Sequence, residues 1–280
     1  MKPLPLIVLL TDFGIDTPYV AQMKGVILDI NPEARIIDLT HSISPPRLGR
    51  GSSPRSCFGG AGAIASQNIT EAVFLLKTSY RYFPKGTVFV VVVDPGVGTE
   101  RRLVCLTNRL GYFFLAPDNG VLSEIGDGTI REITNRKYWL PSVSRTFHGR
   151  DILAPVAAYL SKGLNTSKLG PIIKTIKRLP LRSPEITDRT IRGEVVWIDR
   201  FGNLITNIPE KLVKGRNYAK IVINIKKKII RKISRTYADK KPGSLIALIG
   251  SSGYLELAVN QDSAKEKLKV KAGERMIIRL

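Results

Sequence analysis

The chain has 280 residues, of which 43% are hydrophobic and 24% are charged. This composition is that of a folded soluble protein, and the length suits two modest domains. No stretch approaches the ~20 consecutive apolar residues that a membrane-spanning helix needs. The first apolar run, at residues 4–10, leads into a turn, so we interpret it as a strand and not as a signal peptide.

The few cysteines and histidines argue against a disulfide framework and against zinc. The two cysteines, Cys57 and Cys105, stand far apart, as do the two histidines, His41 and His148. Zinc sites built from Cys and His need closely spaced ligands, so we expect no metal. The cytoplasm is the default compartment for a chain with so few cysteines.

The chain is strongly basic, with 44 Lys and Arg against 23 Asp and Glu and a formal charge of +21. Such a charge raises non-specific affinity for nucleic acid. Basic residues are densest at 211–235, where apolar residues interleave with them. This pattern favours strands with a solvated basic face over a nucleic-acid groove, because no nucleic-acid-binding signature is present. Nucleic acid stays a minor alternative partner, which salt-dependent RNA binding would support.

The first part of the chain alternates strands and helices. The residue patterns predict strands at 6–10, 35–39 and 87–93, helices at 18–30, 70–82 and 152–162, and a hairpin at 103–107 and 112–116. The unbroken apolar run near residue 90 is typical of a strand buried on both faces of a parallel sheet. The alternation therefore predicts an α/β domain over residues 1–170, with a mostly parallel sheet flanked by helices.

The pattern changes after residue 170. Three prolines indicate a linker over residues 171–192, and short strands follow at 194–198, 219–225, 244–248, 254–259 and 275–280. Such spacing predicts a small all-β barrel over residues 193–280. The segment 46–66 is rich in glycine and arginine without an acidic residue, so we expect a flexible insertion there.

Three short motifs follow apolar runs, at residues 94–99, 146–151 and 199–203. The end of a parallel strand followed by a glycine-rich turn is where open α/β sheets bind their ligands. A carboxylate, an arginine and a histidine gathered there can orient and deprotonate a nucleophile.

The residues of these motifs also have structural interpretations. Asp94 and Arg101 suit either a functional pair or a surface ion pair at a strand end, and we favour function. Asp12, after the first strand, suits equally a ribose ligand or a helix cap. A lone histidine is more often structural than catalytic, but His148 has the flexible Gly149 next to it, Arg150 nearby and a predicted helix just after it. We expect the other histidine, His41, to be structural.

The second half of the chain offers groups that a nucleoside needs. Phe201 supplies a flat apolar surface, and Asn203 an amide that can read the edge of a base. The glycine- and serine-rich turn at 250–256 leads into a strand. Either segment also suits a plain hairpin.

With these residues described, the chain closely resembles the S-adenosyl-L-methionine (SAM) hydrolases, also called SAM hydroxide adenosyltransferases, which are relatives of the SAM-dependent fluorinase and chlorinase. The resemblance covers nearly the whole chain. Its ordered motifs lie at residues 11–14, 18–20, 23–25, 38–44, 94–102, 117–120, 146–151, 199–207, 236–239 and 250–260.

The resemblance implies an enzyme that converts SAM and water into adenosine and L-methionine without a cofactor. It implies a homotrimer in which each active site lies between the N-terminal domain of one subunit and the C-terminal domain of a neighbour. The catalytic set of the family falls on Asp94, Arg101 and His148. The ribose-binding aspartate falls on Asp12 and the adenine-binding asparagine on Asn203. Positions lining the methionine and adenine ends fall on Asp199, Phe201, Ser251, Tyr254, Glu256 and Val259.

Three differences from the halogenases favour water as the nucleophile. The halogenases have tyrosine, threonine and serine around their halide, and Asp94, Val97 and Gly149 stand there in this chain. Two features depart from the hydrolase pattern: the insertion at 46–66, over the family's ribose site, and Asp262, where the family usually has glycine. SAM or adenosine binding without turnover, and halogenation, therefore remain as alternatives to hydrolysis.

Overall fold

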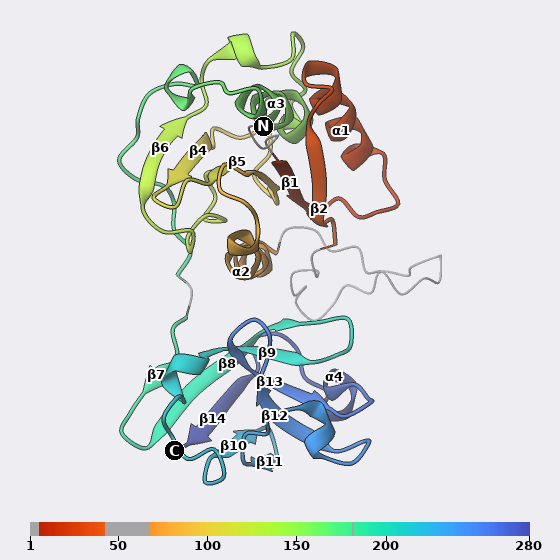
Figure 1. Cartoon of the computed structure of the whole chain (residues 1–280), viewed down its shortest axis with the longest axis vertical. Helices are drawn as coiled ribbons and strands as arrows, with labels where there is room; N and C mark the ends of the chain where they lie inside the picture. Colours follow the sequence, from red (N-terminus) through yellow and green to blue (C-terminus); the bar gives the residue numbers. More distant parts are fainter. Residues whose placement is uncertain (1–5, 43–67, 181) are drawn as a thin grey trace. The chain divides into compact units, whose positions relative to one another are not determined.

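The computed structural model describes residues 6–42, 68–180 and 182–280. The chain divides into two compact units, one ending at Leu179 and the other beginning at Pro180 (Figure 1). Strand structure already begins at Glu185, inside the stretch predicted as a linker. The insertion at 46–66 and Cys57 lie outside the described residues.

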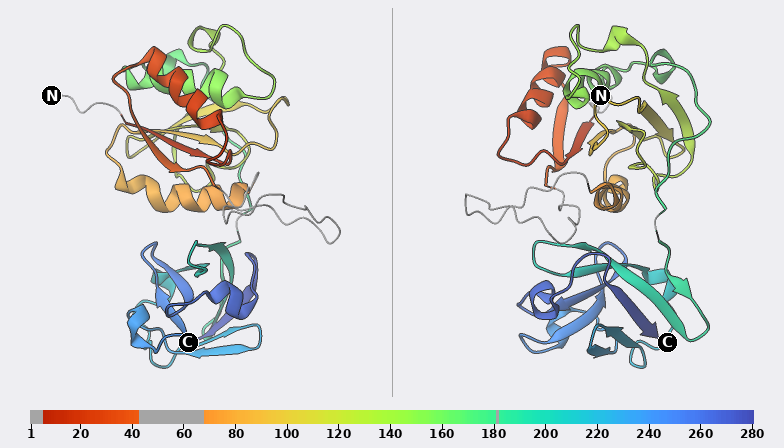
Figure 2. Two further views of the ribbon diagram at one scale, coloured as in Figure 1. Left: turned by 90° about the vertical axis from the view of Figure 1, so that its right-hand side faces the viewer. Right: turned by 180° about the vertical axis from the view of Figure 1, so that it is seen from behind.

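The N-terminal unit is a six-stranded sheet with helices on both faces. Its strands are β1 (Leu6–Thr11), β2 (Arg35–Thr40), β3 (Val88–Val92), β4 (Leu103–Asn108), β5 (Phe113–Pro117) and β6 (Gly128–Glu132). Helices α1 (Tyr19–Ile30) and α3 (Ala154–Ser161) cover one face, and α2 (Ile69–Ser79) covers the other (Figures 1 and 2). The strand order is β2-β1-β3-β5-β4-β6.

Four strands of this sheet, β2, β1, β3 and β5, are parallel, while β4 runs antiparallel to both of its neighbours. The α/β prediction is confirmed, and the sheet is mixed because the predicted hairpin forms and places β4 between β5 and β6. Alternate residues of β1 serve the two faces: Ile7 and Leu9 belong to the core beneath α1 and α3. Val8 and Leu10 are equally buried, which explains the unbroken apolar run.

The helix predicted at 152–162 differs from the structure at its start. Residues Gly149–Leu153 form one π-helical turn, and α3 then runs from Ala154 to Ser161. Similarly, the helix predicted at 70–82 ends as a 3-10 turn at Tyr80–Tyr82. Apolar periodicity finds a buried helix but does not resolve where the backbone changes its hydrogen-bond spacing.

The C-terminal unit is one antiparallel sheet that curls into a nearly closed, barrel-like form. Its strands are β7 (Glu185–Ile186), β8 (Thr190–Ile198), β9 (Leu204–Pro209), β10 (Val222–Ile225), β11 (Lys228–Arg231), β12 (Leu245–Ile249), β13 (Tyr254–Val259) and β14 (Arg275–Arg279). The order is β11-β10-β14-β8-β9-β13-β12, and a bridge from Ser234 to Leu248 joins the chain after β11 to β12. The prediction of an all-β domain is wrong in one detail, because α4 (Ala264–Leu268) follows β13.

Lys269, after α4, offers a test of local backbone strain. It is exposed and has a left-handed backbone, with φ 50° and ψ 50°. Lys269→Gly should raise the free energy of unfolding by about 1 kcal/mol, because a side chain disfavours this conformation. Urea denaturation measures the change. Lys267→Gly, within the same helix, should lower stability, and a Lys269→Gly variant no more stable than the parent contradicts the assignment.

Candidate active site

The site begins where two parallel strands end together. Thr11 of β1 pairs with Val92 of β3, and the Asp12 backbone N–H donates to the Val92 carbonyl oxygen at 3.4 Å. The loops that carry Asp12 and Asp94 therefore leave the same edge of the sheet. This is the edge at which α/β sheets commonly bind ligands.

A tight turn after β3 brings an arginine back onto Asp94. The Gly96 N–H donates to Asp94 Oδ1 at 3.2 Å, and the Thr99 hydroxyl donates to the Gly96 carbonyl at 2.7 Å. Gly98 has φ +83°, and a methyl group there would lie 2.9 Å from the Arg145 carbonyl oxygen. The turn thus needs glycine at this position.

Arg101 is the centre of the site because it bonds both other members of the predicted catalytic set. Its Nε donates to Asp94 Oδ2 at 2.6 Å, and its Nη2 contacts the same oxygen. The Nη2 group also lies 3.0 Å from His148 Nδ1. The side chains of Arg101 and Asp94 are 9% and 8% exposed, so this pair is shielded from water. The structure thus brings the three residues together.

His148 stands directly before the π-helical turn. Turns of this kind are frequent at functional sites. The turn packs closely on β3: a methyl group on Gly149 would lie 3.0 Å from Val92 Cγ1. Asp151 is fully buried in this turn and accepts hydrogen bonds from the Ser144 N–H at 2.7 Å and from Arg150 Nε at 2.6 Å. The backbone that carries the imidazole is therefore fixed from both sides.

The surroundings keep the imidazole neutral. Burial lowers the pKa of His148, and the Arg101 charge lowers it further, against the opposing effect of Asp94 and Asp151. Because Arg101 Nη2 can only donate, a neutral His148 must accept at Nδ1 and carry its proton on Nε2.

Aromatic packing holds the Asp12 loop beside the His148 segment. Phe13, Tyr19 and Phe147 meet edge to face, with ring centroids 5.3–5.6 Å apart. Asp12 is half-buried at the end of β1. Its role as a ribose ligand stays a prediction.

His41 lies beneath this loop, as a structural residue should. It is buried, its Nδ1 lies 2.9 Å from Thr11 Oγ1, and its Nε2 lies 3.0 Å from Asp38 Oδ1. The His41 carbonyl accepts the Gly14 N–H at 2.7 Å. It thus ties the chain after β2 to the end of β1.

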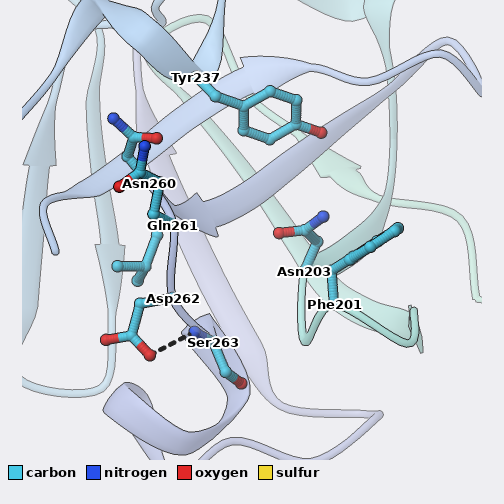
Figure 3. Close-up of a pocket in the computed structure, with 8 residues that line it drawn as sticks. Phe201, Asn203, Tyr237, Asn260, Gln261, Asp262 and Ser263 are labelled. Carbon is cyan, nitrogen blue, oxygen red and sulfur yellow. Dashed lines mark hydrogen bonds between the residues drawn. The ribbon is translucent and has the colours of Figure 1, made fainter. Parts of the chain in front are cut away.

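The C-terminal unit contains a pocket of about 560 Å³ (Figure 3). Three predicted residues line it: Phe201, which is 79% exposed, the buried Asn203, and Val259 at the end of β13. The other lining residues are Tyr237, Asn260, Gln261, Asp262 and Ser263. Asp262, which stands where the family usually has glycine, thus lies on the wall of this pocket.

Asp199 supports the pocket from behind Asn203. Its Oδ2 accepts the Asn203 Nδ2–H at 2.9 Å, and its Oδ1 accepts the backbone N–H groups of Phe201 and Asn203 at 2.9 and 2.8 Å. The carboxylate therefore fixes which atoms of the Asn203 amide face the pocket: the amide oxygen and one N–H stay free of Asp199.

Three further residues expected to line the substrate site lie outside this wall. Ser251 is exposed at the tip of the β12–β13 hairpin, and Tyr254 begins β13. Glu256 is buried, and its Oε1 accepts a hydrogen bond from the Tyr237 hydroxyl at 2.6 Å. Tyr237 is one of the lining residues that the sequence analysis missed. Its signal was present, because segment 236–239 belongs to the family resemblance, but that segment was given no role.

Three further features of the described residues concern metal ligands, membrane-spanning helices and Cys105. Residues 6–42, 68–180 and 182–280 contain no cluster of three or more His, Cys, Asp or Glu that could hold a metal ion. Within the same ranges, no helix has the length and apolar character to cross a membrane. Cys105 is buried in β4, and burial raises its pKa to about 12, so its thiol stays protonated.

Comparison with known proteins places the chain in a family. The SAM hydroxide adenosyltransferase N-terminal domain matches residues 7–53 and 61–170, and the C-terminal domain of that family matches residues 193–277. The chain therefore belongs to the SAM hydroxide adenosyltransferases.

Individual relatives agree with this assignment. The chain is 35% identical to an (R)-S-adenosyl-L-methionine hydrolase of Thermus thermophilus, over 94% of this chain and 95% of the relative. It is 35% identical to the enzyme of the same name from Methanocaldococcus jannaschii, over 95% and 93%. The fluorinase of Nocardia brasiliensis is 28% identical, over 96% and 95%. A crystal structure of an uncharacterized conserved protein from Thermotoga maritima superposes with TM-score 0.86 at 36% identity, covering 97% and 99%.

The protonation of His148 can be tested directly, because the chain has only two histidines. At neutral pH we expect the Nε2–H tautomer, with a pKa below the ordinary 6.5. The unfolded chain takes up this proton near pH 6.5 and the folded protein only at lower pH, so stability falls as the pH decreases from about 6.5 to the folded pKa and levels off below it. Arg101→Leu should raise the pKa of His148. Long-range ¹H–¹⁵N spectra during a pH titration measure both values.

Assignment of the two imidazole signals uses a His41→Asn variant. A pKa of His148 above 6.5 in the parent protein, or an unchanged pKa in Arg101→Leu, would contradict the electrostatic account.

Proposed function

We propose that the protein hydrolyses SAM to adenosine and L-methionine, with water attacking C5′ of the ribose. Family membership supports the reaction, and relatives at 35% identity carry the name of this activity. The observation that carries the proposal is the buried guanidinium of Arg101, which bonds Asp94 and His148 at once. These three residues suit the activation of one water molecule.

The substrate itself makes the reaction feasible. In SAM the sulfur is a positively charged sulfonium, so it leaves C5′ with the electrons of the C–S bond as neutral methionine. The water oxygen forms the new C–O bond, and one water proton passes to the protein. Because the leaving group is already activated, the protein must chiefly position the water and accept this proton. The proposed reaction therefore needs neither a metal nor an organic cofactor.

The hydrogen bonds assign different roles to the three residues. Arg101 occupies Nδ1 of His148, so the neutral imidazole presents Nε2–H as a donor that orients the water oxygen. Asp94 is the acceptor of the water proton. Its Oδ2 is held by Arg101 and its Oδ1 by the Gly96 N–H, which fixes the direction of the carboxylate. Arg101 stabilises the negative charge that develops on the attacking oxygen.

We assign substrate binding to residues of both units. Asp12 binds the ribose hydroxyls, Asn203 binds the adenine edge, and Phe201 and Val259 supply apolar surface to the base. Asp199 and Glu256 act from behind the pocket wall. We keep Ser251 and Tyr254 among the residues proposed to line the methionine and adenine ends.

Packing around Gly149 favours water over halide. A side chain at position 149 would approach Val92 Cγ1 at 3.0 Å and Cγ2 at 3.2 Å, so serine there requires Val92 to shift. The serine that serves the halide in the halogenases would therefore need the Val92 side chain to move by a few tenths of an ångström. This tight fit at Gly149 supports hydrolysis over halogenation.

The reaction is tested by incubating the protein with SAM and separating adenosine and methionine by chromatography. Asp94→Asn should lower kcat by roughly 10²–10⁴-fold, the usual contribution of a positioned base. Glu124→Gln is a matched control that should keep full activity, because Glu124 forms only an exposed ion pair with Lys77, at 2.7 Å. Both sulfonium epimers of SAM should be assayed, since the relatives are named for the (R) form.

Other outcomes of this assay would favour one of the alternative functions. Tight SAM binding without product selects a binding protein, and 5′-halo-adenosine formed with chloride or fluoride selects a halogenase. Full activity in Asp94→Asn would remove Asp94 from the mechanism.

We also propose the homotrimer that the family resemblance implies, with each active site completed by a neighbouring subunit. Asp94→Ala and Asn203→Ala chains, each inactive alone, should regain activity when refolded together. When equal amounts of the two chains mix at random in a closed trimer, roughly one quarter of the sites combine an intact N-terminal domain with an intact C-terminal domain from the neighbour. The mixture should therefore regain roughly one quarter of the parental activity. No recovered activity, or a monomeric mass in solution, would contradict this assembly.

A further inference from the structure

Glu256 is a buried carboxyl group that contacts the pocket only through another residue. It is 6% exposed, and its Oε1 accepts the Tyr237 hydroxyl at 2.6 Å. Tyr237 lines the pocket of the C-terminal unit, but Glu256 does not (Figure 3). A buried carboxyl is costly unless it is hydrogen-bonded, so this contact fixes both partners.

The two residues lie on very different backbones. Glu256 belongs to β13, which pairs on both sides, with Ile205 of β9 and Leu248 of β12 opposite Glu256 itself. Tyr237 lies in a single 3-10 turn, Tyr237–Asp239, and is 42% exposed. A half-exposed ring on a short turn has several accessible rotamers, and a bond to a rigid strand removes them.

The backbone around Glu256 packs closely against its carboxyl group. A methyl group on Gly250 would lie 2.3 Å from Glu256 Oε2, so the hairpin backbone closes directly over this oxygen. Burial raises the pKa of Glu256, the hydrogen bond from Tyr237 opposes this rise, and the nearby negative charge of Asp199 adds to it. Burial also raises the pKa of Tyr237, and its bond to Glu256 raises it further, so the Tyr237 hydroxyl stays protonated and can donate.

We propose that Glu256 is a positioning residue that holds the Tyr237 ring as one wall of the nucleoside pocket. The assignment of a nucleoside to this pocket rests on the proposed function. The pocket then has two supports of the same kind: Asp199 orients the amide of Asn203, and Glu256 orients the ring of Tyr237. Figure 3 shows Asn203 and Tyr237 on different segments of the pocket wall. Neither carboxyl group needs to touch the substrate.

The test measures adenosine binding by calorimetry, which does not depend on turnover. Tyr237→Phe keeps the ring and removes its hydroxyl, so the Kd for adenosine should rise roughly 5- to 10-fold. Glu256→Ala should weaken binding by the same factor, and the double variant should be no weaker than either single variant. Glu256→Gln should bind within roughly 2-fold of the parent, because its amide oxygen still accepts the hydroxyl.

Steady-state SAM hydrolysis supplies the second readout. In Tyr237→Phe, KM should rise by a similar factor while kcat stays at the parental value, because the hydroxyl holds the pocket and not the reacting atoms. Tyr218→Phe is the matched control in the same unit, outside the pocket, and should leave both constants unchanged.

Three results would overturn the inference. These are parental adenosine affinity in Tyr237→Phe, equal losses in Glu256→Gln and Glu256→Ala, and additive losses in the double variant. The proposed function fails separately, since it predicts that the parent protein hydrolyses SAM. A parent protein that hydrolyses SAM but binds no adenosine overturns the inference about this pocket and leaves the proposed function standing.

Discussion

The structure of the candidate active site depends on one buried arginine. Burying a guanidinium is unfavourable unless its hydrogen bonds are satisfied, and removing the partner of such a group costs about 3–5 kcal/mol. Arg101 meets this requirement with Asp94, which lies 7 residues before it in the chain, and with His148, which lies 47 residues after it. The positive charge therefore stabilises the fold locally and, by the same contacts, sets the direction of the carboxylate and the tautomer of the imidazole.

In the C-terminal unit, too, charged side chains orient other groups by hydrogen bonds, but there they are acidic and each orients one neutral group. Asp199 and Glu256 are carboxyl groups at the back of the pocket wall, and each fixes a neutral group that lines the pocket. A neutral amide or phenol can bond a nucleoside base without carrying a charge into the pocket. Keeping the charges one residue behind the wall thus gives oriented, neutral contacts, which suits selection by shape and hydrogen bonding.

The sequence predicts the layered architecture and the catalytic set, and it misses features that depend on local backbone detail. Continuous apolar runs predict β1 and β3 because burial on both faces leaves no polar position. β6 was missed because its residues are mostly polar and none is buried, and β9 was missed because Thr206 and Asn207 interrupt its apolar run. β11 lies in the basic segment 211–235, where strands with a solvated face were expected but not placed. Asp94, Arg101 and His148 could be named from their motifs, whereas the hydrogen bond from Arg101 to Nδ1 requires coordinates. For the same reason Glu256 was expected at the pocket surface, and Tyr237 was not assigned.

In the proposed mechanism, Asp94 directs a water molecule and does not itself attack C5′. A single turnover in H₂¹⁸O, with enzyme in excess over SAM, separates the two chemistries. Direct attack by water places ¹⁸O at the 5′ position of the first adenosine formed. Attack by Asp94 forms an ester whose hydrolysis leaves an unlabelled carboxylate oxygen on that adenosine. The account predicts labelled adenosine from the first turnover, and unlabelled adenosine would contradict it.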